Sequence, residues 1–477
     1  MKSDSYINKT AVLAIILISY VMIVLDISIV ITGLPKIKQD LGFSDAGLSW
    51  ISNAYTLTFG GFLLLGARAG DLLGRRRLFM TGLAIFAVSS LAIGLAQSPA
   101  GLVIARAVQG LGSAILAPAT LALLQTHFAA GRERHRAIAL YASAAGISAS
   151  IGLVLGGILA DWLSWRVGFF INLPVGAALI WAAKHYLPET PTQRGTFDLA
   201  GAFSSTLGMS ALVFAVVHSA VAGWSNTLTL QALTLGLALL TLFVGIEWRA
   251  KQPIMPLRLF AHRERSGAYL VRVLFLGANV GFFFFATQYM QAVRGFSPAL
   301  TGLAFLPAML ANFLVALAVT QLIRRVGAAR VLIGSILVGL CGMLWLSQIA
   351  SDSQYLSGLL LPMILIGIGQ GGAMGPLTIS GVADVAPQDA GAASGLVNVA
   401  HQLGSSLGLG VQVAASAFGI GTLTGAARLT QQVDNAMLAA SAMLALALLL
   451  TLALIVRRTS NEAIHPLPTP SDTAVTE

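Results

Sequence analysis

Charged residues are scarce in this chain of 477 residues: Asp, Glu, Lys and Arg make up 10% of it, against 56% hydrophobic residues. A water-soluble domain needs about a quarter of its residues charged, so this composition excludes an ordinary soluble surface. Cysteine is nearly absent, and the lone Cys341 excludes an internal disulfide. Because Cys341 sits in an apolar run, we expect it to be a small packing residue of the core.

Signatures of catalysis are also missing. The chain has no phosphate-binding P-loop, no metal-ligand cluster and no convincing nucleophile motif. We therefore predict no enzyme, no metal and no other cofactor, and ATP is excluded as the direct source of energy. No connection between the apolar runs is long enough for a separate soluble domain.

Apolar runs of about 20 residues recur along the whole chain, each long enough to cross about 30 Å of hydrocarbon as a helix. In lipid every backbone group must be satisfied within its own segment, so these runs predict an all-α integral membrane protein. We place fourteen spans near 11–34, 47–67, 78–96, 101–125, 137–162, 167–186, 199–220, 228–248, 268–290, 299–322, 331–349, 356–378, 392–419 and 435–456.

The basic residues predict the orientation. With the N-terminus in the cytoplasm, the cytoplasmic segments hold 21 of the 28 Lys and Arg, and the outer loops hold five. This bias accounts for the net charge of +10 without nucleic acid, and anionic lipid headgroups are the expected partner of the basic loops. Both termini are therefore expected in the cytoplasm, in the inner membrane of a bacterial cell.

An internal repeat divides the chain. Gly42-Phe43-Ser44 recurs as Gly295-Phe296-Ser297, and the same offset relates Gly74 to Gly327 and Arg77 to Arg330. Parallel halves around a site at the bilayer midplane are typical of transporters. We predict a cytoplasmic N-terminus (1–10), an N-terminal six-helix bundle (11–186), a two-helix insert with flanking loops (187–267), a C-terminal six-helix bundle (268–456) and a cytoplasmic tail (457–477).

Several motifs carry a family resemblance that covers essentially the whole chain. The segments are Leu25-Asp26-Ile27-Ser28-Ile29-Val30 with Gly33-Leu34-Pro35, Gly70-Asp71-Leu72-Leu73-Gly74-Arg75-Arg76-Arg77, Arg106-Ala107-Val108-Gln109-Gly110-Leu111-Gly112, and Trp165-Arg166 with Phe170-Ile171-Asn172-Leu173-Pro174 and Gly176. Together they resemble the fourteen-span drug:proton antiporters of the major facilitator superfamily. The resemblance implies the major facilitator fold, two six-helix halves with two extra helices between them, driven by the proton gradient.

Two of these motifs imply moving parts. The loop of Gly70, Asp71, Gly74 and Arg75 to Arg77 looks like the superfamily's gating loop, although its arginines also suit plain positive-inside anchoring. Gly146, Gly152, Gly156 and Gly157 match much of the antiporter motif, with Leu153 where that motif usually has proline. Small residues let helices pack closely and also slide, and both interpretations stay open.

Asp26 is the central candidate for function. Among the 18 acidic residues it alone sits well inside an apolar span, where a carboxylate costs several kcal/mol unless it faces water or a partner. Arg106 lies at a similar depth, so the two could pair directly or through water. We predict that they couple transport to protons; the alternatives are a purely structural ion pair, or an arginine that only holds neighbouring helix backbones.

Polar side chains at similar depth are the candidates for a substrate pocket. They are Asn53, Tyr55, Gln109, Asn279, Gln288, Tyr289, Asn398 and Gln402. Asn279 lies at the repeat offset from Asp26, as a neutral counterpart. Of the four residues Phe282 to Phe285, we expect only one or two to line the pocket and some to face lipid. His401 is a possible second titrating group, although a lone membrane histidine is more often a packing residue.

The sequence thus predicts a monomeric, proton-coupled secondary transporter that exports small amphipathic or toxic compounds by alternating access. A single deep carboxylate favours neutral or monovalent compounds over dications. Two alternatives stay open. Proton-linked uptake of a small metabolite is one, and Leu153 leaves room for it; a membrane sensor without transport is the other.

Overall fold

Helices form all the regular structure in the part of the chain that the computed structural model describes, residues 8–128, 132–189, 198–250, 253, 255–385 and 389–456. The first group is α1 (Lys9–Leu41), α2 (Asp45–Leu48), α3 (Trp50–Leu73), α4 (Arg75–Gly94), α5 (Pro99–His127), α6 (Arg132–Trp162), α7 (Trp165–Phe170) and α8 (Asn172–Tyr186). The helices α9 (Leu199–Ala222) and α10 (Thr227–Arg249) and the 3₁₀ turn η1 (Leu257–Ala261) follow. The last group is α11 (Arg263–Gln288), α12 (Pro298–Val326), α13 (Ala328–Leu346), α14 (Leu361–Gly381), α15 (Ala390–Ser416) and α16 (Gly425–Leu450), with the π turns η2 (Tyr289–Val293), η3 (Tyr355–Leu360) and η5 (Thr451–Ile455).

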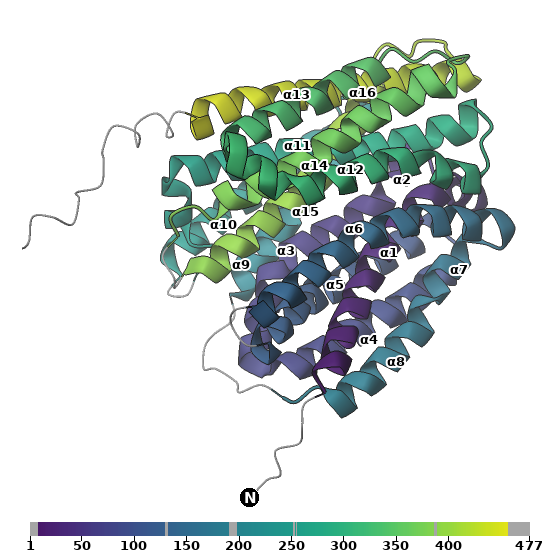
Figure 1. Cartoon of the computed structure of the whole chain (residues 1–477). Coiled ribbons are helices and arrows are strands. Elements are labelled where there is room, and N and C mark those ends of the chain that lie inside the picture. The colour runs from purple at the N-terminus through teal and green to yellow at the C-terminus, as the bar shows by residue number, and fades with distance from the viewer. Residues whose placement is uncertain are drawn as a thin grey trace, which may run out of the picture.

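Eleven helical segments within the described residues are long and apolar enough to cross a membrane, so the chain is a multi-pass membrane protein. They include α7 with α8 as one segment and α11 with η2 as another. Three further helices, α3, α6 and α15, have 24, 31 and 27 residues, also enough to span. We call the end of the bundle where α1 begins the basic end, because it carries Arg75 to Arg77, and the end with α2 and α7 the distal end (Figure 1).

The helices form two bundles, α1 to α8 and α11 to α16, which lie side by side (Figure 1). Two helix pairs make the most extensive contacts between them, and α1 also touches α11 and α12. Helix α6 packs against α12, and α3 packs against α15. The insert helix α9 lies along the second of these seams, where Thr206 contacts Gly61 of α3 and Val213 contacts Gly410 of α15. Helix α10 packs outside α9, through the close approach of Gly236 to Gly208.

The two bundles repeat each other in backbone detail. Gly42 and Gly295 both have positive φ, at 72° and 67°, and each precedes a serine-capped helix. Ser44 accepts from the amide of Gly47 at 3.0 Å, and Ser297 accepts from the amide of Leu300 at 3.2 Å. These matching turns fit the repeat predicted from the sequence.

Glycines of α6 let two helices approach its backbone. A Cβ atom on Gly152 would lie 2.6 Å from Ser28 Cβ, and one on Gly156 would lie 2.5 Å from Ile29 Cα, both on α1. On Gly157 it would lie 2.3 Å from the carbonyl oxygen of Pro298 on α12. The predicted antiporter motif therefore provides close packing at the helix segment that carries Asp26 and at the seam between the bundles. The side-chain surroundings of position 146 lie outside what the structure describes.

Two sequence expectations are wrong in detail. Cys341 is exposed on α13 rather than packed in the core, because the apolar run faces outward at that position. Phe282, Phe284 and Phe285 are all buried and Phe283 is half-buried, since neighbouring helices surround α11 on most sides. Some helices are longer than the apolar segments that they contain. Helix α1 continues through Pro35 to Leu41, and α16 begins at Gly425. Polar residues beside an apolar run can still be helical.

The glycine contacts generate a prediction for packing. Gly156→Leu should destabilise the protein by about 1–3 kcal/mol or prevent folding, because the added side chain overlaps the backbone of α1. The matched control is Gly245→Leu on α10, where nothing lies within 4 Å of an added Cβ atom. Thermal unfolding in detergent is the measurement, and equal stability of the two variants would contradict the packing role of Gly156.

Candidate functional site

A buried ion pair joins α1 to α5. Arg106 Nη1 donates to Asp26 Oδ2 at 2.7 Å, and each residue is 2% exposed. The geometry answers the question of distance that the sequence left open, because the two charges meet directly. A buried carboxylate needs such a partner together with further hydrogen bonds for its remaining lone pairs.

The other oxygen of Asp26 is held by two amides. Gln109 Nε2 on α5 and Asn172 Nδ2 on α8 each donate to Asp26 Oδ1 at 2.9 Å. The same two amides also donate to Ser90 Oγ on α4, at 2.6 and 3.2 Å. Helices α1, α4, α5 and α8 are therefore tied to one carboxylate.

Arg106 is fixed as firmly as its partner. Its Nε donates to the carbonyl oxygen of Ile51 on α3 at 3.0 Å, and its Nη1 also donates to Gln109 Oε1 at 2.6 Å. The guanidinium lies over the ring of Tyr55, 4.4 Å from the ring centre, and Tyr55 itself hydrogen-bonds Ser113 at 2.8 Å. Arg106, Gln109 and Ser113 of α5 thus all contribute to this cluster.

The arrangement gives Asp26 two states that differ in their contacts. Ionised, it accepts three hydrogen bonds from Arg106, Gln109 and Asn172. A proton on Oδ2 would remove the charge that holds Arg106, leaving a buried cation to find water or another acceptor. A change of charge at Asp26 would therefore alter the contact between α1 and α5.

The second bundle has a neutral link between the corresponding helices. Gln370 Nε2 on α14 donates to Asn279 Oδ1 on α11 at 2.6 Å, and Asn312 of α12 donates to Gln370 at 3.3 Å. Asn279 also donates to the carbonyl oxygen of Phe275 at 2.7 Å. Asn279 therefore occupies the place of Asp26 in its own bundle without a charge.

The remaining predicted pocket residues do not gather in one place. Asn53 accepts from Ser406 Oγ at 3.1 Å across the α3–α15 seam, and Gln402 also lies on this seam, beside Gly60. Asn398 is exposed and donates to the carbonyl oxygen of Ser394. The half-buried His401 lies next to Gln402 on α15.

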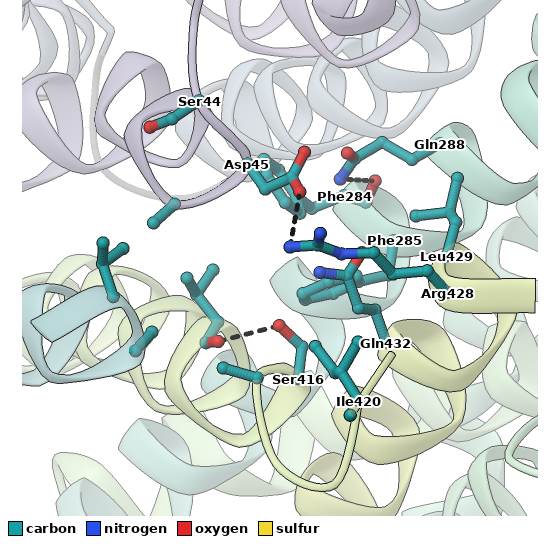
Figure 2. A pocket seen from close by; sticks show the side chains of 16 residues that line it. Ser44, Asp45, Phe284, Phe285, Gln288, Ser416, Ile420, Arg428, Leu429 and Gln432 are labelled. Atoms are coloured by element: carbon teal, nitrogen blue, oxygen red, sulfur yellow. Dashed lines mark hydrogen bonds and ion pairs between the residues drawn. The ribbon is translucent and has the colours of Figure 1, made fainter. Parts of the chain in front are cut away.

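Two predicted residues lie toward the distal end. The Tyr289 hydroxyl donates to the carbonyl oxygen of Ala350, and Tyr289 is fully buried. Gln288 lines a cavity of about 440 Å³ between α2, α9, α11, α15 and α16, together with Phe284 and Phe285 (Figure 2). Across this cavity Arg428 of α16 pairs with Asp45 of α2 at 3.9 Å, so that the two bundles are linked there (Figure 2).

The predicted gating loop closes the basic end of the first bundle. Gly74 has φ +100°, and Arg75 Nη1 donates to Thr126 Oγ1 on α5 at 2.6 Å. The backbone amide of Arg76 donates to Glu189 Oε1 at 3.1 Å, and Arg77 lies 3.6 Å from the same carboxylate. Gly70 packs near Arg75. The side chain of residue 71 lies outside the described residues.

Sequence reasoning missed several members of the polar clusters. Ser90 lies in an apolar stretch, and Asn172 contributed only to a motif, so neither was assigned a role. Gln370 was missed because it has no charge and no repeat partner at the offset that relates Asn279 to Asp26. Depth along the chain identified Gln109, but depth does not indicate which residues of other helices Gln109 contacts.

Known proteins resemble the chain along most of its length. The profile of the family described as Major Facilitator Superfamily matches residues 16–409. The cephamycin export protein CmcT of Amycolatopsis lactamdurans is 38% identical over 438 residues, 90% of this chain and 90% of that protein. The puromycin resistance protein pur8 of Streptomyces alboniger is 39% identical over 401 residues, 83% and 80% of the two chains. The multidrug resistance protein Stp of Mycobacterium tuberculosis (strain CDC 1551 / Oshkosh) is 33% identical over 85% of this chain and 75% of Stp.

Solved structures share the fold. A bacterial homologue of the human lysosomal transporter Spinster, inward-facing and unoccupied, superposes with a TM-score of 0.67 at 14% identity, covering 98% of this chain and 100% of that one. The tetrameric PepTSo2 structure gives a TM-score of 0.65 at 16% identity, covering 94% and 99%. Likeness at such low identity shows the architecture.

The buried pair generates a stability prediction. Asp26→Asn and Arg106→Gln should each destabilise the protein by about 3–5 kcal/mol, because each leaves the other partner without its buried counterpart. The double variant should lose less than the sum of the two. The control is Asp40→Asn, which removes a more exposed pair with Arg166 and should cost about 0–1 kcal/mol.

Thermal unfolding of the purified variants in detergent measures these differences. Single variants at Asp26 and Arg106 that are as stable as Asp40→Asn would contradict the importance of the pair.

Proposed function

Because the chain belongs to the major facilitator superfamily, we propose that it is a proton-coupled secondary transporter that exports small amphipathic or toxic compounds by alternating access. The observation that carries the coupling is the ion pair of Asp26 and Arg106, buried where α1 meets α5. Superfamily members are transporters rather than enzymes, in agreement with the prediction from the missing catalytic motifs.

The names of the similar proteins support export as the direction of transport. Two of the similar proteins are named for resistance to puromycin or to many drugs, and one is named for export of cephamycin. Each matches this chain along most of its length, so the likeness includes both bundles and the insert. We extend the direction of transport from these relatives to this chain.

The orientation proposed here follows the basic residues. Arg75 to Arg77 lie at the basic end, which we assign to the cytoplasm of a bacterial cell, with both termini on that side. Adding α3, α6 and α15 to the eleven apolar segments gives fourteen spans. The bundles correspond to residues 11–186 and 268–456, and the insert lies between them along the α3–α15 seam.

Coupling follows from the two states of Asp26. Entry of a proton from the outside would neutralise the carboxylate and free Arg106, and its release to the cytoplasm would restore the pair. A compound whose binding favours the ionised, paired state would expel the proton, and the proton would in turn expel the compound. Such mutual displacement is antiport.

The conformation of the bundles suits this cycle. Their distal ends are held together, since Gln291 Nε2 donates to the carbonyl oxygen of Thr32 at 2.9 Å and Arg428 pairs with Asp45. Opening toward the outside would have to break both contacts. The close packing of Gly157 against Pro298 would have to loosen with them.

The proposal generates a transport prediction. In inverted membrane vesicles with an imposed proton gradient, the wild-type protein should accumulate a dye or antibiotic substrate inside the vesicles. An uptake transporter would instead move the substrate out of them. Asp26→Asn should lose this gradient-driven accumulation, because the variant side chain cannot exchange a proton at neutral pH. Exchange of labelled against unlabelled substrate without a gradient should persist.

The control is again Asp40→Asn, which should retain gradient-driven transport. Substrates are first identified by growth of an exporter-deficient bacterium on a panel of dyes, biocides and antibiotics. Gradient-driven accumulation by Asp26→Asn at the wild-type level would contradict the coupling role.

A further inference from the structure

The other bundle holds two buried arginines on α11, which differ in the acceptors around them. Arg265 donates to the carbonyl oxygens of Leu259, Ala383 and Asp384, whereas Arg272 has few acceptors and, within the described part of the chain, no counter-charge. Arg272 is on α11, about 14 Å along the helix axis beyond Arg263, and its side chain is 7% exposed. Its Nη1 donates to Thr378 Oγ1 on α14 at 3.2 Å, and its Nε has no hydrogen-bond partner. Among the residues that the structure describes, no carboxylate lies within ion-pair distance of it.

The comparison with Arg106 shows how unusual this is. Arg106 is 2% exposed, and it has a carboxylate, a carbonyl oxygen and an amide oxygen as acceptors. A guanidinium carries its charge at all physiological pH values and offers five donors. An anion would supply the acceptors that Thr378 alone does not. Arg272 is therefore a buried cation whose hydrogen-bonding capacity its own chain leaves partly unfilled.

Its surroundings place Arg272 on the inner surface of the second bundle. Gln370, Met374 and Thr378 occupy every fourth position of α14 and share one face, where Gln370 bonds to Asn279 of α11 and to Asn312 of α12. That face therefore looks between α11 and α12. Exposure along it increases toward the basic end, from the half-buried Gln370 and Met374 to the exposed Thr378.

Another polar group approaches from a third helix. His401 of α15 is half-buried and lies close enough to Arg272 for their charges to interact. Arg272, Thr378 and His401 thus bring one permanent cation and two hydrogen-bonding side chains together from α11, α14 and α15. An oxyanion with two acceptor atoms fits such a set, because a guanidinium binds carboxylate or phosphate oxygens in pairs.

We propose that Arg272 binds the anionic group of the transported compound, so that amphipathic monoanions, carboxylates above all, are preferred over cations. The inference rests on the proposed function, whose substrate class it specifies. Asp26 does not oppose it, because its charge is already matched by Arg106 and attracts no cation. The charge at Arg272, which has no carboxylate beside it among the described residues, is positive.

Binding of an acid and its methyl ester tests the proposal. The probes are naphthaleneacetate and its methyl ester, added to protein purified in dodecyl maltoside, with the rise in Tm against concentration as the readout. The wild-type protein should bind the acid about tenfold or more tightly than the ester, as expected for a charge-assisted hydrogen bond. Arg272→Gln should abolish this preference, and Arg272→Lys should keep part of it.

Two controls separate binding from folding. Arg324→Gln, at the exposed end of α12, removes a cation of the basic end and should leave the preference unchanged. Thr378→Val changes an exposed residue and should weaken the preference by a few-fold without loss of fold. A wild-type protein without preference for the acid, or an unchanged preference in both Arg272→Gln and Thr378→Val, would overturn the proposal.

A lipid phosphate could supply the same oxyanion chemistry. In that case phosphatidylglycerol, added in place of the acid, would raise the Tm of the wild-type protein but not the Tm of Arg272→Gln. The acid and its ester would then bind equally tightly. This result would overturn the assignment of the site to the transported compound. Asp26→Asn distinguishes the two proposals. Acid preference that persists in Asp26→Asn supports the site at Arg272, whatever that variant shows about proton coupling.

Discussion

A carboxylate inside a bundle of apolar helices must find its counter-charge within the protein, and much of the architecture depends on how Asp26 does so. Its two oxygens collect hydrogen bonds from α5 and α8, while Ser90 of α4 and the carbonyl oxygen of Ile51 on α3 support the donors. The glycines of α6 bring another helix against α1 at Ser28 and Ile29, close to the same carboxylate. A change of charge at Asp26 therefore acts on several helices of the first bundle at once.

The two bundles share a plan but differ in charge. In the first, α1 and α5 are joined by an ion pair, and in the second, α11 and α14 are joined by the amides of Asn279 and Gln370. The amide link carries no charge, so the proton-coupled cycle that we propose uses the first bundle. The second bundle instead carries the unpaired Arg272. Proton handling and binding of the compound are thus assigned to different bundles, which alternating access moves relative to each other.

Much of the fold could be predicted because lipid imposes strict rules on sequence. Apolar length located the helices, the turns at Gly42 and Gly295 revealed the repeat, and depth along the helices identified both Asp26 and Arg106. What failed depends on neighbours that spacing does not reveal. The exposure of Cys341 and the burial of Phe284 are set by which helix lies opposite, and Asn172 joined the site only because α8 packs beside α1. Residues grouped by depth as one pocket are in fact divided between a seam, a cavity and an ion-pair network.

The central claim is that binding of a transported compound and protonation of Asp26 exclude each other. Proton release on binding tests it most directly, measured with a pH indicator in weakly buffered detergent solution as an identified substrate is added to the purified protein. With the measurement repeated over a range of pH, the account predicts release from the wild-type protein and none from Asp26→Asn, although the variant still binds the compound. Equal proton release from both proteins would contradict it.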